Sequence, residues 1–137
     1  MSRDTIGDFL TVIRNGVMVS KPYVLFPYSN LALQIAELLK SEGFVRDTVV
    51  EVREGVEAIG RPARMIKIVL KYVERESVIH EIKRVSTPGR RLYAGSDELK
   101  PVIGGLGVTI LTTNRGVVTN KTAKKLNVGG EVICTVW

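Results

Sequence analysis

The chain has 137 residues, of which 45% are hydrophobic, so it can bury the core of one ordinary domain or of two small ones. Its longest uncharged stretch, residues 102–114, contains three glycines and is shorter than the ~20 apolar residues that span a bilayer. We therefore do not expect a membrane protein. The first residues lack the basic start and uninterrupted apolar run of a secretory signal, so we do not expect an exported protein either. The single cysteine excludes an internal disulfide and a cysteine cluster for a metal within one chain, and the single histidine excludes a two-histidine metal site.

The formal net charge of +6 and the isoelectric point of 9.7 favour an anionic partner, such as nucleic acid or an acidic membrane surface. The charge is uneven along the chain. Residues 76–137 hold 9 basic and 5 acidic side chains, and no acidic residue occurs between Glu98 and Glu131. The carboxy-terminal half is therefore the expected anion-binding half.

The first residues predict a helix, because apolar residues recur there every three or four positions. Thr5 and Asp8 have the spacing of a capping box at its start. The apolar stripe consists of Ile6, Phe9, Leu10, Ile13 and Val17.

A short strand and a second helix are expected next. Residues 23–26 are apolar and lie between two prolines that cannot continue a helix. Ser29 is expected to cap the second helix, and Gly43 to close it in a left-handed conformation. The expected buried face is Leu31, Ile35, Leu38 and Leu39, with Lys40 and Glu42 facing water.

Two strands are expected over residues 44–53 and 65–72, where β-branched or alternating apolar residues predominate. A glycine-containing loop between them permits a hairpin, which gives the order α-β-α-β-β. The charged residues Glu74, Arg75 and Glu76 mark a domain boundary. We expect an amino-terminal domain at residues 1–73 and a carboxy-terminal domain at residues 74–137.

The second half predicts five strands and two short helices. Pro88 and Gly89 stand in the order that a type II turn prefers. One helix opens at Ser96 and Asp97, and Asn120 is expected to cap the other, which ends near Leu126. The strands are expected at residues 78–85, 91–94, 108–112, 116–119 and 131–137, with Val132, Cys134 and Val136 on one face of the last.

The connections between these elements are mostly of hairpin length, which favours antiparallel pairing over a doubly wound parallel sheet. The predicted fold class is α+β. It comprises two small mixed domains, an amino-terminal α-β-α-β-β domain and a mostly antiparallel β carboxy-terminal domain with short helices.

Residues 112–119 concentrate hydroxyl, amide and guanidinium groups on a tight turn, where Gly116 is free to take a positive φ. Short side chains that donate and accept hydrogen bonds suit the 2′-hydroxyls and base edges of the wide RNA minor groove. Arg115 would then hold a phosphate nearby. On the residues alone, an ordinary hairpin tip is the favoured interpretation, because Asn and Gly are common in turns.

Two basic segments are further candidates. Four cations bracket the turn at residues 86–89 and precede Tyr93, whose ring could stack on a base, but a solvated edge strand explains this segment equally well. The second segment is the helix that starts near Asn120, where unpaired like charges four residues apart favour a bound anion. The cations are Lys83, Arg84, Arg90 and Arg91 in the first segment and Lys121, Lys124 and Lys125 in the second.

Three other features of the sequence do not indicate a functional site. Residues 104–107 contain three glycines but precede a strand, and no Lys-Ser/Thr pair follows them, so we reject a nucleotide-binding loop. His80 and Glu81 are neighbours in a predicted strand and would point to opposite faces, so they form no catalytic dyad. Cys134 is expected to be a small core residue.

Several long segments, in this order, resemble the family of bacterial small-subunit ribosomal protein eight. They are residues 83–93 (KRVSTPGRRLY), 105–107 (GLG), the loop at 112–119 and residues 125–137 (KLNVGGEVICTVW). Residues 13–15 (IRN) and 38–44 (LLKSEGF) are similar to the family's amino-terminal half. In the family the loop commonly reads Ser-Thr-Ser-Lys-Gly, from which Thr112, Asn114 and Arg115 depart, and Asn30 stands where a lysine is usual.

The resemblance implies a cytoplasmic protein of the small ribosomal subunit, from a bacterium or a plastid. It implies two small α+β domains that bind the central domain of small-subunit ribosomal RNA early in assembly, among neighbouring small-subunit proteins, without catalysis, metal or cofactor. By position, Thr112, Thr113 and Asn114 would enter the minor groove of an irregular RNA helix, with Arg115 on its backbone. The expected RNA-binding set is completed by Ser86, Thr87, Arg90, Arg91, Tyr93, Gly116, Lys121, Lys124, Lys125, Gly130 and Glu131.

Two alternatives remain open. A messenger RNA of the protein's own operon that imitates the ribosomal site could be bound and repressed, as the resemblance allows. A protein-interaction module whose basic face meets an acidic partner is the other, and co-sedimentation with small ribosomal subunits would separate it from a ribosomal protein. An enzyme is disfavoured because no pair of titratable groups can be placed together from the sequence.

Overall fold

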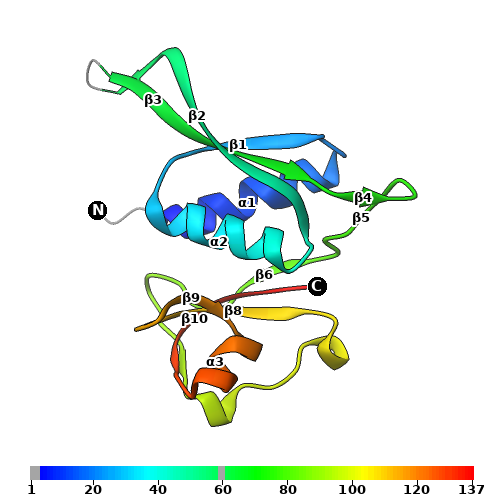
Figure 1. Ribbon diagram of the computed structural model, residues 1–137, viewed down its shortest axis with the longest axis vertical. Coiled ribbons are helices and arrows are strands. Elements are labelled where there is room, and N and C mark those ends of the chain that lie inside the picture. The colour runs from blue at the N-terminus through cyan, green and yellow to red at the C-terminus, as the bar shows by residue number, and fades with distance from the viewer. Residues whose placement is uncertain (1–3, 59–60) are drawn as a thin grey trace. The chain divides into compact units, whose positions relative to one another are not determined.

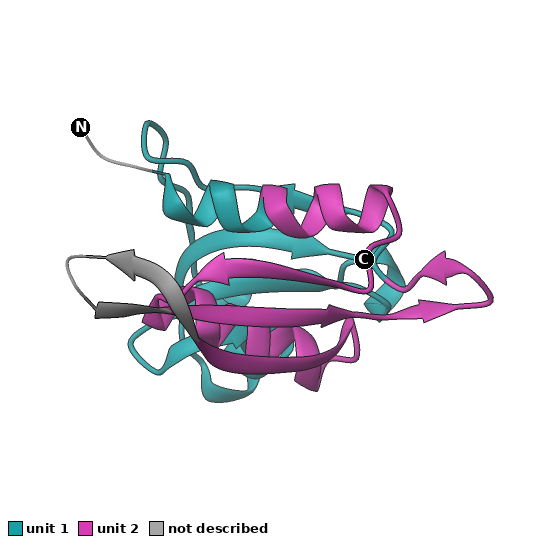
Figure 2. Ribbon diagram, turned by 90° about the horizontal axis from the view of Figure 1, so that it is seen from above, with its two compact units in different colours: residues 1–10, 79–137 teal, residues 11–78 magenta. Residues whose placement is uncertain are grey.

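A computed structural model describes residues 4–58 and 61–137 of the chain. It divides into two compact units, which Figure 2 colours separately. The first comprises residues 1–10 with 79–137, and the second residues 11–78. Each unit mixes helices with antiparallel strands, which confirms the predicted α+β class. The predicted domain boundary between residues 73 and 74 stays a prediction.

The second unit is built on a three-stranded antiparallel sheet with the strand order β1-β3-β2. Helices α1 and α2 lie on the same side of this sheet (Figure 1). The element order α-β-α-β-β matches the prediction, and a small β4–β5 hairpin follows it. The elements are α1 (Thr5–Met18), of which residues 11–18 belong to this unit, β1 (Tyr23–Pro27), α2 (Asn30–Ser41), β2 (Val45–Ala58), β3 (Arg61–Leu70), β4 (Tyr72–Val73) and β5 (Glu76–Ser77).

The core of the second unit forms because alternate residues of β3 point toward the helices. Ile66, Ile68 and Leu70 are buried, as the predicted period of two requires. Burying an isoleucine or leucine side chain stabilises a fold by about 1.5–3 kcal/mol. Phe44, just before β2, and Val45 at its start are also buried, and the helices and β1 contribute Ile13, Val24, Phe26, Ala32, Ile35, Ala36 and Leu39.

The boundaries and faces of these elements correct several predictions. Asp4, and not Thr5, caps α1, because its Oδ1 accepts a hydrogen bond from the Gly7 amide at 3.0 Å. In α2 the predicted Leu31 and Leu38 are only partly buried, because the alanines Ala32 and Ala36 let the helix approach the sheet closely. Ser29 caps α2 as predicted, with its Oγ 3.1 Å from the Ala32 amide, and Gly43 has a φ of +82°.

The glycine-containing loop predicted between residues 53 and 65 is wrong in length. Strands β2 and β3 continue to Ala58 and from Arg61, and the pairing shifts register between Arg53 and Glu57. A bulge of this kind absorbs extra residues without ending the strands. The hairpin is thus longer than the β-branched runs of the sequence indicate.

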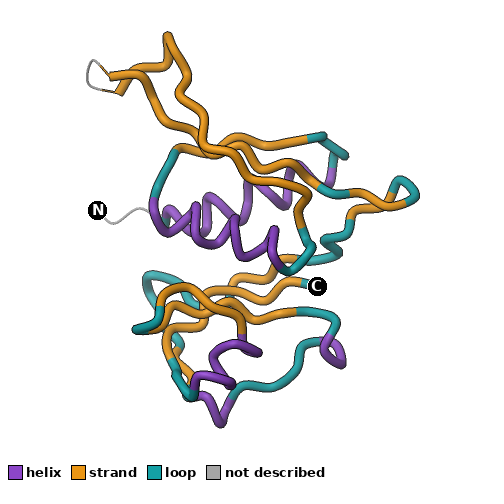
Figure 3. Tube along the Cα trace, viewed as in Figure 1, coloured by secondary structure: helices purple, strands orange, loops and turns teal. Residues whose placement is uncertain are grey.

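The first unit contains a sheet with the strand order β6-β10-β8-β9, and β7 also pairs with β10. Figure 3 shows short helical turns on the long connection that precedes β8. The elements are β6 (Ile82–Arg84), β7 (Tyr93–Ala94), the 3-10 turns η1 (Ser96–Glu98) and η2 (Ile103–Gly105), β8 (Val108–Thr113), β9 (Gly116–Thr119), α3 (Asn120–Leu126) and β10 (Gly130–Val136).

Helix α3 covers one face of this sheet (Figure 1). Ala123 of α3 packs in one buried cluster with Leu111 of β8, Val118 of β9 and Leu99. Leu111 and Val118 are paired across the two strands and therefore point to the same face. The other face of the sheet carries the residues between them in sequence, such as Thr112 and Val117.

The first unit also corrects several local predictions. The strands predicted at 78–85 and 91–94 are paired only over Ile82–Arg84 and Tyr93–Ala94. Gly89 has no positive φ, so the turn between Thr87 and Arg90 is not of type II. The cap of α3 is Thr119, whose hydroxyl accepts from the Thr122 amide, and not Asn120.

The predicted alternation of the last strand is interrupted. The register of β10 against β8 shifts between Val132 and Cys134, so Ile133 is buried beside Cys134 and Val136, whereas Val132 is only partly buried. A bulge turns the side chains after it relative to those before it.

Candidate nucleic-acid interface

The turn between β8 and β9 is held together by the side chain of Thr113. Its hydroxyl donates to the carbonyl oxygen of Gly116 at 3.0 Å and accepts from the amide of Arg115 at 3.0 Å. Gly116 has a φ of +94°, a conformation that glycine adopts without steric cost. Thr113 therefore shapes the turn, and Asn114 and Arg115 are the exposed residues at its tip. Arg115 forms no ion pair with another residue that the structure describes.

A row of side chains crosses the sheet next to this tip. Tyr93 of β7 lies opposite Glu131 of β10, Glu131 opposite Thr112 of β8, and Thr112 opposite Val117 of β9. Directly opposed residues of antiparallel strands share a face, so these four side chains lie on the face that α3 does not cover. Tyr93 is 70% exposed, and its ring is available for stacking. We call this row, with the tip residues Asn114 and Arg115, the reading face.

Gly130 lets β10 approach β8 closely at this point. A Cβ atom on residue 130 would collide with the carbonyl oxygen of Thr112. The absence of a side chain thus brings Glu131 directly beside Thr112. Gly130 therefore shapes the backbone beside the loop, and its expected place in the RNA-binding set stays a prediction.

The loop over residues 85–92 connects β6 to β7, and both of these strands pair with β10. Its two ends are tied to β10 by the Val85 amide, which donates to Ile133, and by the Val132 amide, which donates to Leu92. Thr87 and Arg90 pair with each other at the exposed tip of the loop. The loop therefore holds Thr87 and Arg90 out into solvent.

Glu131 binds both sides of the base of this loop. Its Oε2 accepts from the Ser86 hydroxyl at 2.6 Å and from Arg91 Nη1 at 3.0 Å. The Ser86 hydroxyl also accepts from the Leu92 amide at 3.1 Å. Partial burial acts to raise the pKa of the Glu131 carboxyl, but the hydrogen bonds from Ser86 and Arg91 outweigh it and hold that pKa below its ordinary value. Glu131 is thus an anchor for Ser86 and Arg91, with its charge compensated by Arg91.

The lysines of α3 lie apart from the reading face. Since α3 packs against Leu111 and Val118, it covers the opposite face of the sheet. Lys121 Nζ donates to the carbonyl oxygen of Gly105 at 3.1 Å, and Lys124 Nζ to that of Leu99 at 3.5 Å. The structure therefore brings the expected RNA-binding residues together in two groups, on the two faces of one sheet.

Comparison with known proteins decides the family. The family model described as ribosomal protein S8 matches residues 4–137. The chain belongs to the ribosomal protein S8 family. It is 45% identical over 137 residues to the small ribosomal subunit protein uS8 of Geobacter sulfurreducens, with 98% of this chain and 97% of that protein covered. It is 48% identical over 141 residues to the protein of the same name from Thermosipho africanus, with both chains fully covered.

The sequence of this S8-family chain gives no sign of one ion pair near the reading face. Arg84 Nη1 donates to both carboxylate oxygens of Asp4, at 2.5 and 2.6 Å, and Arg84 Nε donates to the Ser86 carbonyl. Burial acts to raise the pKa of Asp4, yet the hydrogen bonds from Arg84 and Gly7 leave it below its ordinary value. The partners are 80 residues apart, and an aspartate before a helix is explained by capping alone, so no local signal indicates the pair.

The cysteine and the histidine of this S8-family chain lie in different environments. Cys134 is fully buried, and burial raises the pKa of its thiol to about 12, so it is unreactive in the folded state. His80 is exposed and lies outside the strands, so the strand predicted there is wrong. Within residues 4–58 and 61–137, no three His, Cys, Asp or Glu side chains are grouped to hold a metal ion, and no helix is long and apolar enough to cross a bilayer.

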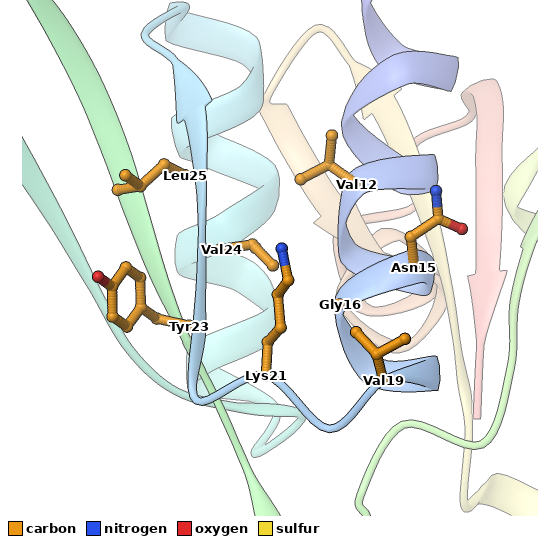
Figure 4. Close-up of a pocket in the computed structure, with 8 residues that line it drawn as sticks. All are labelled: Val12, Asn15, Gly16, Val19, Lys21, Tyr23, Val24 and Leu25. Carbon is orange, nitrogen blue, oxygen red and sulfur yellow. The ribbon is translucent and has the colours of Figure 1, made fainter.

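The second unit contains a hollow of about 500 Å³ between the end of α1 and β1 (Figure 4). The side chain of Lys21 extends between the two elements, and Val24 points toward α1 while Tyr23 and Leu25 point away from it. Its lining contains no His, Cys, Asp or Glu. The hollow therefore combines apolar side chains with the Lys21 ammonium group and the Asn15 amide.

Proposed function

We propose that this chain is a structural constituent of the small ribosomal subunit that binds the central domain of small-subunit ribosomal RNA and assists its assembly. Membership of the S8 family and the names of its relatives support the ribosomal part of the proposal. The reading face supports the RNA-binding part. The proposed role needs no catalysis, metal or cofactor, and it places the chain in the cytoplasm among neighbouring small-subunit proteins.

The main support for the proposal is the exposed pair of side chains at the tip of the β8–β9 turn. Asn114 offers donors and an acceptor, and Arg115 offers a cation without a protein counter-ion among the described residues. The turn is narrow enough to enter the shallow RNA minor groove, where 2′-hydroxyls and base edges are accessible. Thr112 and Tyr93 would contact the adjoining ribose and base surfaces, with Tyr93 stacking through its exposed ring.

The residues at the base of the 85–92 loop have a supporting role in this mechanism. Ser86 is 3% exposed and Glu131 is bound to it, so neither is free to bind RNA without breaking a protein contact. Arg91 is held in place by Glu131, whereas Arg90 and Thr87 are exposed at the loop tip. We propose that Arg90 and Arg91 contact phosphates, while Ser86 and Glu131 keep the loop in position.

The first experiment compares binding to a central-domain RNA fragment with binding to a regular duplex of equal length, over a range of salt concentrations. Phosphate contacts alone give both RNAs the same affinity and the same steep salt dependence. We expect a higher affinity for the central-domain fragment that persists as salt rises. Equal affinities at every salt concentration would contradict specific recognition.

The same face could also bind a messenger RNA of the chain's own operon, if that RNA presents an irregular helix of the same shape. The proposal then predicts competition, because one surface cannot hold both RNAs. Addition of unlabelled operon leader RNA should displace the labelled ribosomal fragment, and the displacement should disappear when the leader's helix is made regular. Simultaneous binding of both RNAs would refute this extension.

A further inference from the structure

A second, smaller hollow of about 160 Å³ lies in the first unit, between α3 and the connection at residues 99–105. Three lysines surround it: Lys100 of the connection and Lys121 and Lys124 of α3. None of the three forms an ion pair with a described residue. Like charges on adjacent helical turns oppose each other, so a bound anion would stabilise the cluster.

The ammonium groups of Lys121 and Lys124 are held at the hollow by backbone carbonyls. Lys121 Nζ donates to Gly105 and Lys124 Nζ to Leu99. An ammonium group has three N–H donors, so each keeps two for a ligand. Fixing the side chains in advance reduces the entropy that they lose when an anion binds.

Asn120 fixes the wall of the hollow. Its side chain is almost fully buried; its Oδ1 accepts from the Thr109 amide at 3.1 Å and its Nδ2 donates to the Lys100 carbonyl at 3.3 Å. These two bonds connect the start of α3 to β8 and to the connection that carries Lys100. The spacing of the lysines is therefore set by the fold of the unit rather than by flexible surface segments.

The hollow and the reading face are turned in different directions, so we do not expect one RNA groove to contact both. They lie on opposite faces of the sheet, because α3 covers the face that Thr112 and Tyr93 do not share. They also lie at opposite ends of β8, since Asn120 binds Thr109 and the tip follows Thr113, about 13 Å along the strand at 3.3 Å per residue. A shallow groove cannot reach around the edge of the sheet to both.

We propose that Lys100, Lys121 and Lys124 form a second phosphate-binding site, which holds a segment of the central domain other than the helix that the reading face contacts. The inference rests on the proposed function. The residues that line the hollow include three lysines and no Asp or Glu, which fits a polyanion, and phosphates position a nucleic acid without reading its sequence. The chain would then join two RNA segments.

The test uses the full-length chain and two RNAs. The long RNA is the complete central domain, and the short RNA is its smallest truncation to which the reading face still binds specifically. The pocket variant carries Lys121→Gln and Lys124→Gln. A control variant carries Arg46→Gln and Arg75→Gln, which removes the same charge from exposed residues of the other unit. Circular dichroism checks that both variants fold.

We expect the pocket variant to bind the short RNA within twofold of wild type and the long RNA at least fivefold more weakly. Its log–log salt slope on the long RNA should fall by about 0.7–0.9 for each phosphate that the variant no longer neutralises. The control should bind both RNAs as wild type does. Equal weakening on both RNAs would overturn the second site, and so would unchanged binding to the long RNA. Unchanged binding is also the result expected if the lysines contact a protein partner and not RNA. If wild type does not prefer either RNA to a regular duplex, the proposed function itself fails, which is a different result.

Discussion

The hydroxyl of Thr113 has a structural role inside the turn, which differs from its expected direct contact with RNA. The family resemblance implies that this hydroxyl meets RNA directly. In the structure it donates to Gly116 and accepts from Arg115, so it closes the turn that presents Asn114 and Arg115. An effect of this residue on RNA binding would therefore act through the shape of the turn.

Replacing Thr113 with Val removes both hydrogen bonds and keeps the shape of the side chain. We expect it to lower the free energy of unfolding by about 1 kcal/mol and to weaken binding to the central-domain RNA by about 1–3 kcal/mol. Thr113→Ser keeps the hydroxyl and should retain most of both. Chemical denaturation and RNA titration measure the two quantities, and full affinity for Thr113→Val would argue against a role for the turn.

Glu131 predicts a pH dependence of stability. Its pKa in the folded state is below the ordinary value, so its contribution is complete above the ordinary glutamate pKa and disappears as the pH falls through the lower, folded value. Glu131→Gln should therefore be less stable than wild type at pH 7, and the difference should shrink in acid. Denaturant unfolding from neutral to acidic pH measures it. A gap that stays constant over this range would show that the charge of Glu131 does not act through Ser86 and Arg91.

At the scale of elements, the start of α1 combines a cap with an ion pair. Asp4 accepts from the Gly7 amide and binds Arg84. Asp4→Ala removes both, and we expect a decrease of about 1–2 kcal/mol in unfolding free energy, mostly from the cap. Asp4→Asn keeps an acceptor for the amide and should cost less than about 1 kcal/mol, as is usual for partly exposed ion pairs. Chemical denaturation compares the two variants, and if they were equally unstable, the cap would not be the larger contribution.

Two neighbouring residues at the start of α3 have different roles: Thr119 caps the helix, and Asn120 accepts from the buried amide of Thr109. Thr119→Ala removes the cap and should lower the unfolding free energy by about 1 kcal/mol. Asn120→Ala leaves the buried Thr109 amide without its acceptor, so a larger decrease of about 1–3 kcal/mol is expected. Thermal unfolding of the two variants ranks them. The reverse order would mean that the buried amide of Thr109 does not depend on Asn120.

Elements with strong periodicity could be predicted from the sequence. The buried residues Phe9, Leu10 and Ile13 of the α1 stripe, the alternation of Ile66, Ile68 and Leu70, and the pairing of β8 with β9 follow from local spacing. Ile6 and Val17 of the predicted stripe are only partly buried. The caps of α1 and α3 lie one residue before the predicted ones, because adjacent polar residues have similar chemistry and only the backbone decides which one turns inward. The bulge in β10 leaves no local mark, since it depends on how the strand pairs with β8.

The candidate site could be predicted only in part at the scale of the whole molecule. The sequence indicates its exposed residues, such as Tyr93 and Arg115, because charge and turn composition are local properties. It cannot show that the α3 lysines lie on the other face of the sheet, nor that Arg84 binds Asp4, because both depend on contacts between distant segments. The fold therefore divides the basic residues of the carboxy-terminal half into two groups, on opposite faces of one sheet.

The central claim is that the tip of the β8–β9 turn gives the chain its preference for one RNA structure. The most direct measurement is the ratio of affinities for the central-domain RNA and for a regular duplex, in wild type and in a variant with Asn114→Ala and Arg115→Gln. Because both side chains are exposed and Arg115 has no ion-pair partner among the described residues, the variant should fold normally. We predict that the ratio falls at least tenfold, mainly through weaker binding to the central-domain RNA. An unchanged ratio in a folded variant would contradict the claim.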